Sequence, residues 1–241
     1  MRHRLKLLCC ALLAALGASI AVAARAETAV DVNLVLAVDT SGSVNAARYE
    51  LQRQGYAAAF RNPRVWQGIA AGAHHAIAVT MMQWTGPSLH AVVVDWTLVQ
   101  DQASAEALAS RLESLPRQLF GGGTSLSGAI DYSMQLLARS PYKADRQVID
   151  VSGDGSNNRG RPAEFARDAA VKAGAVINGL PILALEPDLD RYYRESVIGG
   201  TGAFVVVARS YDDFAEAVLE KLVNEVASNA TPPAHVARTG G

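Results

Sequence analysis

Residues 33–43 constrain the fold of this chain more than any other stretch. An unbroken apolar run, 34–38, leads directly into the oxygen-bearing side chains of Asp39, Ser41 and Ser43. An apolar run without alternation is typical of a strand that helices cover on both faces. In open α/β sheets, ligands bind where such strands end. We therefore expect this stretch to supply the first half of a divalent-metal site.

Strand-like and helix-like segments alternate along the rest of the chain. Apolar residues at three-to-four spacing predict helices at 44–60, 105–115, 126–137, 162–174, 189–197 and 214–226. Short apolar runs predict further strands at 77–84, 91–96, 147–152, 176–183 and 204–208. The alternation predicts one α/β domain, a doubly wound, mainly parallel sheet of about six strands with helices on both faces.

The sequence also predicts the direction of one edge strand and the buried face of one helix. Gly86-Pro87 forms a short turn between 77–84 and 91–96, which makes these strands an antiparallel pair and 91–96 the antiparallel edge strand. In the helix that starts at Pro162, we expect Phe165 and Ala169 to face the core.

Both ends of the chain differ from this pattern. Basic residues precede the apolar run 7–24, and Ala24-Arg25-Ala26 has the form of a signal-peptidase site. Residues 1–26 are therefore predicted to be a cleaved signal peptide, with a retained membrane anchor as the alternative. Nothing else in the chain has the pattern of a membrane span. The folded domain is expected at 27–227, and the Pro- and Gly-containing tail 228–241 is expected to be disordered.

Charge and cysteine content limit the classes of partner and chemistry that are open to this chain. The whole chain carries 22 basic and 23 acidic residues, and four of the basic residues lie in 1–26. Cleavage leaves 18 basic residues against 23 acidic ones, a net charge of −5, which argues against a nucleic-acid partner. Both cysteines, Cys9 and Cys10, lie in the signal segment, so the remaining domain folds without thiols or disulfides.

Oxygen donors occur at three predicted loops. Asp39, Ser41 and Ser43 follow the first strand, Thr124 follows a run of three glycines, and Asp154 follows strand 147–152. The carboxyl ends of parallel strands share one edge of the sheet, so these groups are expected to converge. Two carboxylates and three hydroxyls suit a hard divalent cation, because Mg²⁺ prefers oxygen ligands and retains exchangeable waters.

These three loops resemble the metal-ion-dependent adhesion site of von Willebrand factor A domains. Asp39-Thr40-Ser41-Gly42-Ser43 matches the family's Asp-x-Ser-x-Ser motif, Gly122-Gly123-Thr124 its threonine loop, and Ser152-Gly153-Asp154-Gly155 the loop of its second aspartate. The order and spacing of the elements agree with the family from about Asp31 to Ala227, and the short form is similar to secreted bacterial members.

The resemblance implies a Rossmann-like fold and a function in protein binding rather than catalysis. It implies that Asp39, Ser41, Ser43, Thr124 and Asp154 hold Mg²⁺, or alternatively Mn²⁺ or Ca²⁺. An exposed Asp or Glu of a partner protein, whose identity stays open, would complete the coordination. With the signal peptide, it implies a periplasmic or secreted bacterial protein. The charge count agrees, since two carboxylates neutralise a dication and an incoming acid supplies a further negative charge.

Several other interpretations stay open at this point. Ser41 and Ser43 are also typical of a helix cap. Asp39, His74 or His75, and Ser125 occur in the order of a subtilisin-like triad, which keeps a serine hydrolase as a remote alternative. Residues 121–123 faintly resemble a nucleotide loop, but no Gly-Lys-Ser/Thr accompanies them. A metal-free scaffold with the same fold is the remaining alternative.

The spacing of the histidines in the sequence does not indicate a zinc site. His74 and His75 precede a strand and His90 follows a turn, without a cysteine or an i, i+4 histidine pair. We interpret them as surface histidines at strand ends. Asp150, beside the end of strand 147–152, is interpreted as structural.

Overall fold

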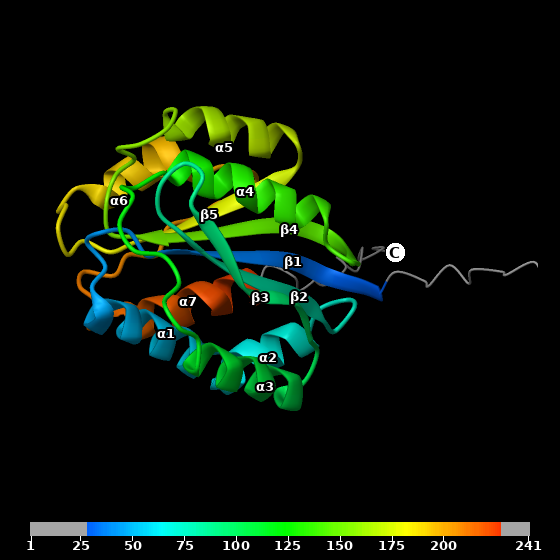
Figure 1. The fold of residues 1–241 in the computed structure, drawn as a ribbon. Helices are drawn as coiled ribbons and strands as arrows, with labels where there is room; N and C mark the ends of the chain where they lie inside the picture. The colour runs from blue at the N-terminus through cyan, green and yellow to red at the C-terminus, as the bar shows by residue number, and fades with distance from the viewer. Residues whose placement is uncertain (1–27, 228–241) are drawn as a thin grey trace, which may run out of the picture.

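The computed structural model describes residues 28–227, which form one α/β domain (Figure 1). The predicted signal peptide 1–26 and the predicted tail 228–241 lie outside the described residues. The sheet has five strands in the order β3-β2-β1-β4-β5. The strands are β1 Thr28–Asp39, β2 Ile77–Trp84, β3 His90–Val99, β4 Tyr142–Gly153 and β5 Ala175–Pro181. Only β3 runs antiparallel, at the edge, so the predicted fold class is confirmed.

Helices cover both faces of the sheet (Figure 1). One face carries α1 Ala46–Arg61, α2 Pro63–Ala70, α3 Gln102–Glu113 and α7 Phe214–Ala227. The other carries α4 Leu126–Ala138, α5 Ala163–Lys172 and α6 Leu189–Tyr192, and α6 continues into the π-helix η1 Tyr193–Val197. Among residues 28–227, no helix combines the length and apolar character needed to cross a bilayer.

The central strand β1 explains why its sequence does not alternate. All of its residues from Val30 to Asp39 are buried. Leu34 and Leu36 belong to the core beneath α1, α3 and α7, whereas Val35 and Ala37 belong to the core beneath α4 and α5. Successive side chains of a strand point to opposite faces, so a strand covered on both sides must be apolar at every position.

Three local features differ from the sequence-based expectations. Pro63 ends α1 but also starts α2, because its fixed φ suits a first helical position and the Asn62 side chain caps the Arg64 N–H. Strand β4 begins at Tyr142, five residues before the predicted start. The predicted strand 204–208 is reduced to isolated bridges, Val205 with Gly179 and Ala208 with Ile182.

The sequence-based prediction of which residues of α5 face the core is wrong. Phe165 is 59% exposed and Ala169 is exposed, whereas Ala163, Ala166 and Ala170 are buried. Because the helix begins at Ala163, the three-to-four spacing that follows from this residue is occupied by alanines. Small side chains therefore face the core, and the aromatic ring points away from it.

A glycine in α1 allows close packing against α7. A Cβ on Gly55 would lie 2.8 Å from Cδ1 of Phe214 and 3.2 Å from the Cα of Ala215. The neighbouring Tyr56 ring packs edge-on against Phe214, with ring centroids 5.5 Å apart.

We expect Gly55→Ala to destabilise the protein although alanine favours helices. The higher helix propensity of alanine contributes about 1 kcal/mol, whereas overpacking a core typically costs about 1–3 kcal/mol. Urea unfolding measures the net loss, with Gln54→Ala as the control because Gln54 is exposed on the same helix. A Gly55→Ala variant as stable as the wild type would contradict this close contact.

Candidate metal-binding site

Asp39 is the last residue of β1, and its side chain is completely buried. Its Oδ1 atom accepts the backbone N–H of Ser41 at 2.7 Å, and its backbone carbonyl accepts the side-chain amide of Gln52 at 3.2 Å. Its Oδ2 atom has no hydrogen-bond partner among the described residues. A buried carboxylate oxygen without a donor is costly, so this atom is available to a cation.

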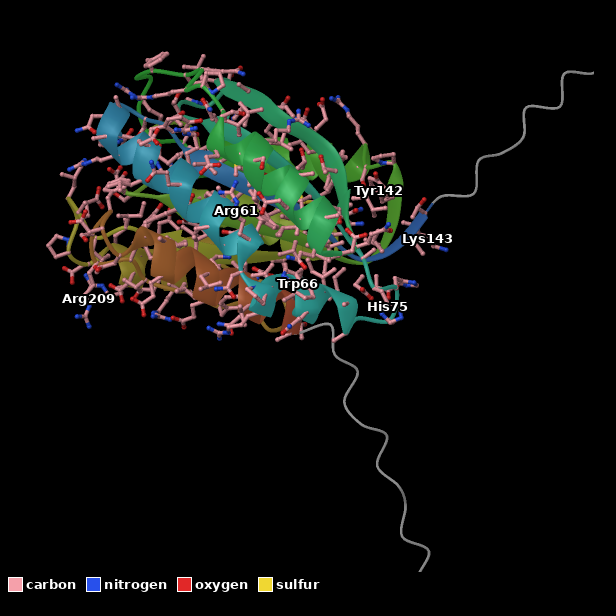
Figure 2. The ribbon with its side chains drawn as sticks, turned by 90° about the horizontal axis from the view of Figure 1, so that it is seen from below. Arg61, Trp66, His75, Tyr142, Lys143 and Arg209 are labelled. Atoms are coloured by element: carbon pink, nitrogen blue, oxygen red, sulfur yellow. The ribbon has the colours of Figure 1, made fainter. Side chains whose placement is uncertain are left out.

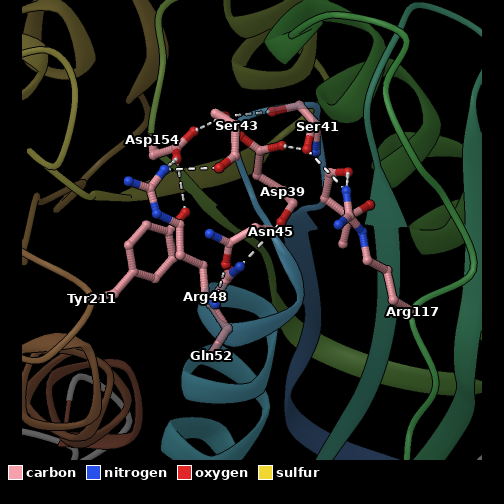
Figure 3. Close-up of polar contacts among 10 residues, drawn as sticks. Asp39, Ser41, Ser43, Asn45, Arg48, Gln52, Arg117, Asp154 and Tyr211 are labelled. Atoms are coloured by element: carbon pink, nitrogen blue, oxygen red, sulfur yellow. Dashed lines mark hydrogen bonds and ion pairs between the residues drawn. The ribbon is translucent and has the colours of Figure 1, made fainter.

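Ser43 lies between Asp154 and Ser41 at this edge (Figure 3). The Ser41 and Ser43 hydroxyl oxygens are 3.1 Å apart, and the Ser43 hydroxyl donates to Oδ1 of Asp154 at 2.5 Å. Neither serine caps α1, because its cap is Asn45, whose side chain accepts the Arg48 N–H. The helix-cap interpretation of the two serines is therefore wrong.

Asp154, in the loop after β4, is the most connected group of the site (Figure 3). Its Oδ2 atom accepts the Tyr211 hydroxyl at 2.9 Å and lies 3.4 Å from Nη1 of Arg48. The same Arg48 nitrogen donates to the Ser43 carbonyl at 2.8 Å. Neither Arg48 nor Tyr211 was predicted. Arg48 follows the motif by five residues, but the sequence carries no sign that Tyr211 reaches this loop.

The loop that carries Thr124 contacts both other loops. The Thr124 carbonyl accepts the N–H groups of Asn158 and Arg159 at 2.9 and 3.1 Å, and its N–H donates to Oδ1 of Asn158 at 2.9 Å. Its hydroxyl oxygen lies 3.7 Å from the position that a Cβ on Gly155 would occupy. Across the site, a Cβ on Gly42 would lie 3.9 Å from the Cα of Gly121. The three loops that carry the five predicted residues thus meet at one edge.

The backbone conformation of the loop before Thr124 favours glycine at three successive positions. Gly121, Gly122 and Gly123 have φ values of +74°, +97° and +82°, a region that other residues rarely adopt. A Cβ on Gly123 would also lie 2.6 Å from Cγ of Arg159. The backbone path of the loop therefore accounts for the glycines without a nucleotide.

The electrostatics of the site favour a cation. Burial, and after it the neighbouring charge of Asp154, raises the pKa of Asp39 to about 7. The two carboxylates repel each other, but burial has the larger effect on the pKa of Asp39. Burial, followed by the charges of Asp39 and Asp154, also raises the pKa of Tyr193. Three hydroxyls and two carboxylates, one of which has an unpaired buried oxygen, fit a hard divalent ion.

The histidines lie elsewhere. The ring of His90 stacks on Tyr132 with centroids 4.6 Å apart, whereas His74 lies beside Asp31, near the start of β1. Asp31 and Asp39 are eight residues apart on an extended strand, which corresponds to about 26 Å. His74 therefore does not reach Asp39 or Ser125, and the arrangement does not support a serine-hydrolase triad. No sequence pattern indicated that His74 would lie beside Asp31.

Solved structures with the same fold include von Willebrand factor A domains. Proximal thread matrix protein 1 from the mussel byssus, in a structure with a zinc-occupied MIDAS motif, is 14% identical with a TM-score of 0.57, over 83% of this chain and 47% of its own. The pilus adhesin SpaC from Lactobacillus rhamnosus GG is 16% identical with a TM-score of 0.57, over 83% of this chain and 31% of its own. The vWF domain of the type V pili tip protein Mfa5 from Porphyromonas gingivalis is 12% identical with a TM-score of 0.58, over 84% and 97%.

The fold is thus that of a von Willebrand factor A domain. This chain spans less than half the length of the mussel and Lactobacillus proteins that it matches. No curated protein matches its sequence. A family model described as "Protein of unknown function (DUF1194)" matches residues 29–230, and the chain belongs to this family.

The raised pKa of Asp39 predicts how the metal-free protein responds to pH. Because its pKa of about 7 in the folded state exceeds the ordinary value of 3.8, the folded state retains a proton that the unfolded state has lost. Stability is therefore lost as the pH rises from about 4 to about 7.

We expect the melting temperature in EDTA to be higher near pH 5 than near pH 7.5, and Asp39→Asn to reduce the difference. Asp95→Asn is the matched control, because the Asp95 side chain is 90% exposed. Thermal melting followed by circular dichroism measures both variants. Equal pH slopes for wild type and Asp39→Asn would show that Asp39 does not carry this proton.

Proposed function

We propose that this chain is an exported, metal-dependent binding module that recognises a partner protein through an acidic side chain. Asp39, Ser41, Ser43, Thr124 and Asp154 would hold Mg²⁺ or, alternatively, Mn²⁺ or Ca²⁺. The bound ion would supply positive charge and a coordination position for a carboxylate of the partner. The observation that carries the proposal is the buried, unpaired Asp39 Oδ2 atom at the edge where three loops meet.

Charge at the site favours an anionic partner group. Asp39 and Asp154 together balance a divalent cation, and Arg48 adds a positive charge 3.4 Å from Asp154. The loaded site would therefore be net positive, and a carboxylate would complete it better than a neutral ligand. Because the Arg48 side chain is 27% exposed, solvent screens part of this effect.

Apolar side chains near this edge support a protein partner. Leu89, Phe120 and Leu185 are 46%, 71% and 54% exposed. Leu89 lies against Gly122, Phe120 precedes Gly121, and Leu185 precedes Glu186, which lies close to Gly155. Large apolar groups that remain exposed beside a polar site are typical of protein-binding surfaces.

In this function the ion takes part in recognition rather than catalysis. The protein would act in the periplasm or outside the cell. The predicted signal peptide at 1–26 supports export. Two of the proteins with this fold are a pilus adhesin and a pilus tip protein. The acidic net charge outside the signal segment speaks against nucleic acid as the partner.

Metal binding should stabilise the fold. At a concentration of 100 times its dissociation constant, Mg²⁺ is expected to add about 2.7 kcal/mol. We expect a higher melting temperature of the full chain in Mg²⁺ than in EDTA, and Asp39→Ala to remove most of the gain. Asp95→Ala should keep it. An unchanged Mg²⁺ response in Asp39→Ala would contradict the site and leave a metal-free scaffold as the better description.

Arg48 should have opposite effects on the metal and on the carboxylate. Removing its charge is expected to tighten Mn²⁺ binding roughly tenfold, since a like charge near the ion disappears. It should weaken the binding of acetate to the Mn²⁺-loaded protein.

Water-proton relaxation of bound Mn²⁺ measures both effects with Arg48→Gln, because a carboxylate that enters the coordination displaces water. Arg53→Gln is the control, since Arg53 pairs with Glu50 on the same helix. Acetamide, a neutral molecule of similar shape, should not compete. Equal responses to acetate and acetamide would count against recognition of an acidic group.

A further inference from the structure

A second group of metal-ligating side chains lies at the opposite end of the sheet. It consists of Asp31 on β1, His74 in the loop between α2 and β2, and Asp145 on β4. One ligand atom from each side chain lies within 4.8 Å of the others. His75 of the same loop, and Tyr142 and Lys143 at the start of β4, lie at this end of the molecule in Figure 2, whereas Arg209 lies at the other end.

Asp31 is a buried carboxylate without an ion pair among the described residues. It is 3% exposed. Its Oδ1 atom accepts the backbone N–H of His74 at 2.9 Å, and its Oδ2 atom accepts that of Ala76 at 3.4 Å. Two N–H groups satisfy hydrogen bonds but bring no positive charge. A buried carboxylate is normally compensated by a cationic partner or a metal ion, and none of the Lys–carboxylate or Arg–carboxylate ion pairs among residues 28–227 includes Asp31.

A second acid lies directly beside it. Strand β1 pairs with β4 through Val30 opposite Ala144 and Val32 opposite Arg146, so Asp31 lies opposite Asp145 on the same face. Like charges opposite one another on adjacent strands are destabilising. The His74 ring contacts this pair, with Nε2 3.2 Å from Oδ2 of Asp145. The three side chains therefore converge on a position that favours positive charge.

The loop that presents His74 is shaped around Asp31. A Cβ on Gly72 would lie 2.1 Å from Oδ2 of Asp31, so any other residue there would displace the Asp31 carboxylate. His75 has a positive φ of 55°, and its Nδ1 lies 2.7 Å from the Ala70 carbonyl oxygen. The His74 backbone is held by Asp31, while its ring extends to Asp145.

We propose that Asp31, His74 and Asp145 bind a divalent transition-metal ion of the Zn²⁺ type. One imidazole nitrogen and two carboxylates form a donor set that suits Zn²⁺ rather than Mg²⁺, for which all-oxygen ligands are typical. Three protein ligands leave a further position for water or for a group from another molecule. The ion would tie the beginnings of β1 and β4 to the α2–β2 loop, and it is independent of the site at Asp39.

The experiment compares variants of the full chain in which Cys9→Ser and Cys10→Ser remove the thiols. Zn²⁺ binding is measured by equilibrium dialysis, and the coordination by the visible absorption of bound Co²⁺. His74→Asn and Asp145→Asn remove exposed ligands, and His75→Asn is the matched control because asparagine also tolerates a positive φ. Asp39→Ala removes a predicted ligand of the other site.

His74→Asn and Asp145→Asn are each expected to weaken Zn²⁺ binding at least about tenfold and to abolish the Co²⁺ bands. His75→Asn and Asp39→Ala should leave the Co²⁺ bands unchanged. Melting temperatures in EDTA check that each variant is folded, and Zn²⁺ should raise the melting temperature less in His74→Asn and Asp145→Asn than in the wild type. Unchanged Zn²⁺ binding in His74→Asn and Asp145→Asn would overturn the proposal. An equal loss in His75→Asn would show ordinary surface binding by histidine and would overturn it as well.

Discussion

The structure depends on the burial of the Asp39 carboxylate at the end of a strand that is covered on both faces. Because β1 is buried from Val30 to Asp39, no water can compensate this charge from the side of the core. The turn after the strand supplies one backbone N–H, and Asp154 lies close enough to raise the pKa of Asp39 still further. A fold that places two acids at one edge in this way is stabilised when protons or cations are present there.

Asp154 connects this edge with elements that are distant in the sequence. It joins Ser43 and Arg48 after β1 to Tyr211, which precedes α7. Further along α7, Lys221 lies 2.9 Å from the buried Asp150 of β4 and 3.1 Å from Glu225, and Asn178 of β5 donates to Glu225 at 2.6 Å. Polar contacts thus attach the helix to the sheet both just before its start, at Tyr211, and further along, at Lys221 and Glu225. Phe214 and Val218 also pack in the core.

At each end of the sheet two carboxylates lie close together, but the other potential metal ligands beside them differ. At the carboxyl edge, Asp39 and Asp154 are accompanied by hydroxyl groups, which suits a hard ion. At the opposite edge, Asp31 and Asp145 are accompanied by the imidazole of His74, which suits a softer one. In both places a buried acid and a neighbouring acid come from adjacent strands, β1 and β4, or from the loop that follows them.

Residue patterns alone were sufficient for the fold class, because apolar runs and helical spacing follow from which faces are buried. They also predicted that Asp39, Ser41, Ser43, Thr124 and Asp154 would share an edge, since parallel strands end on the same side. Arg48 and Tyr211 could not be predicted, because side-chain contacts between distant loops leave no local pattern. The same holds for Asp31, His74 and Asp145, whose proximity depends on the register of β1 with β4 and on the start of β4 at Tyr142. Periodicity indicates which faces of most elements are buried, although it failed for Phe165 in α5, but only the tertiary structure decides which side chains of distant loops come into contact.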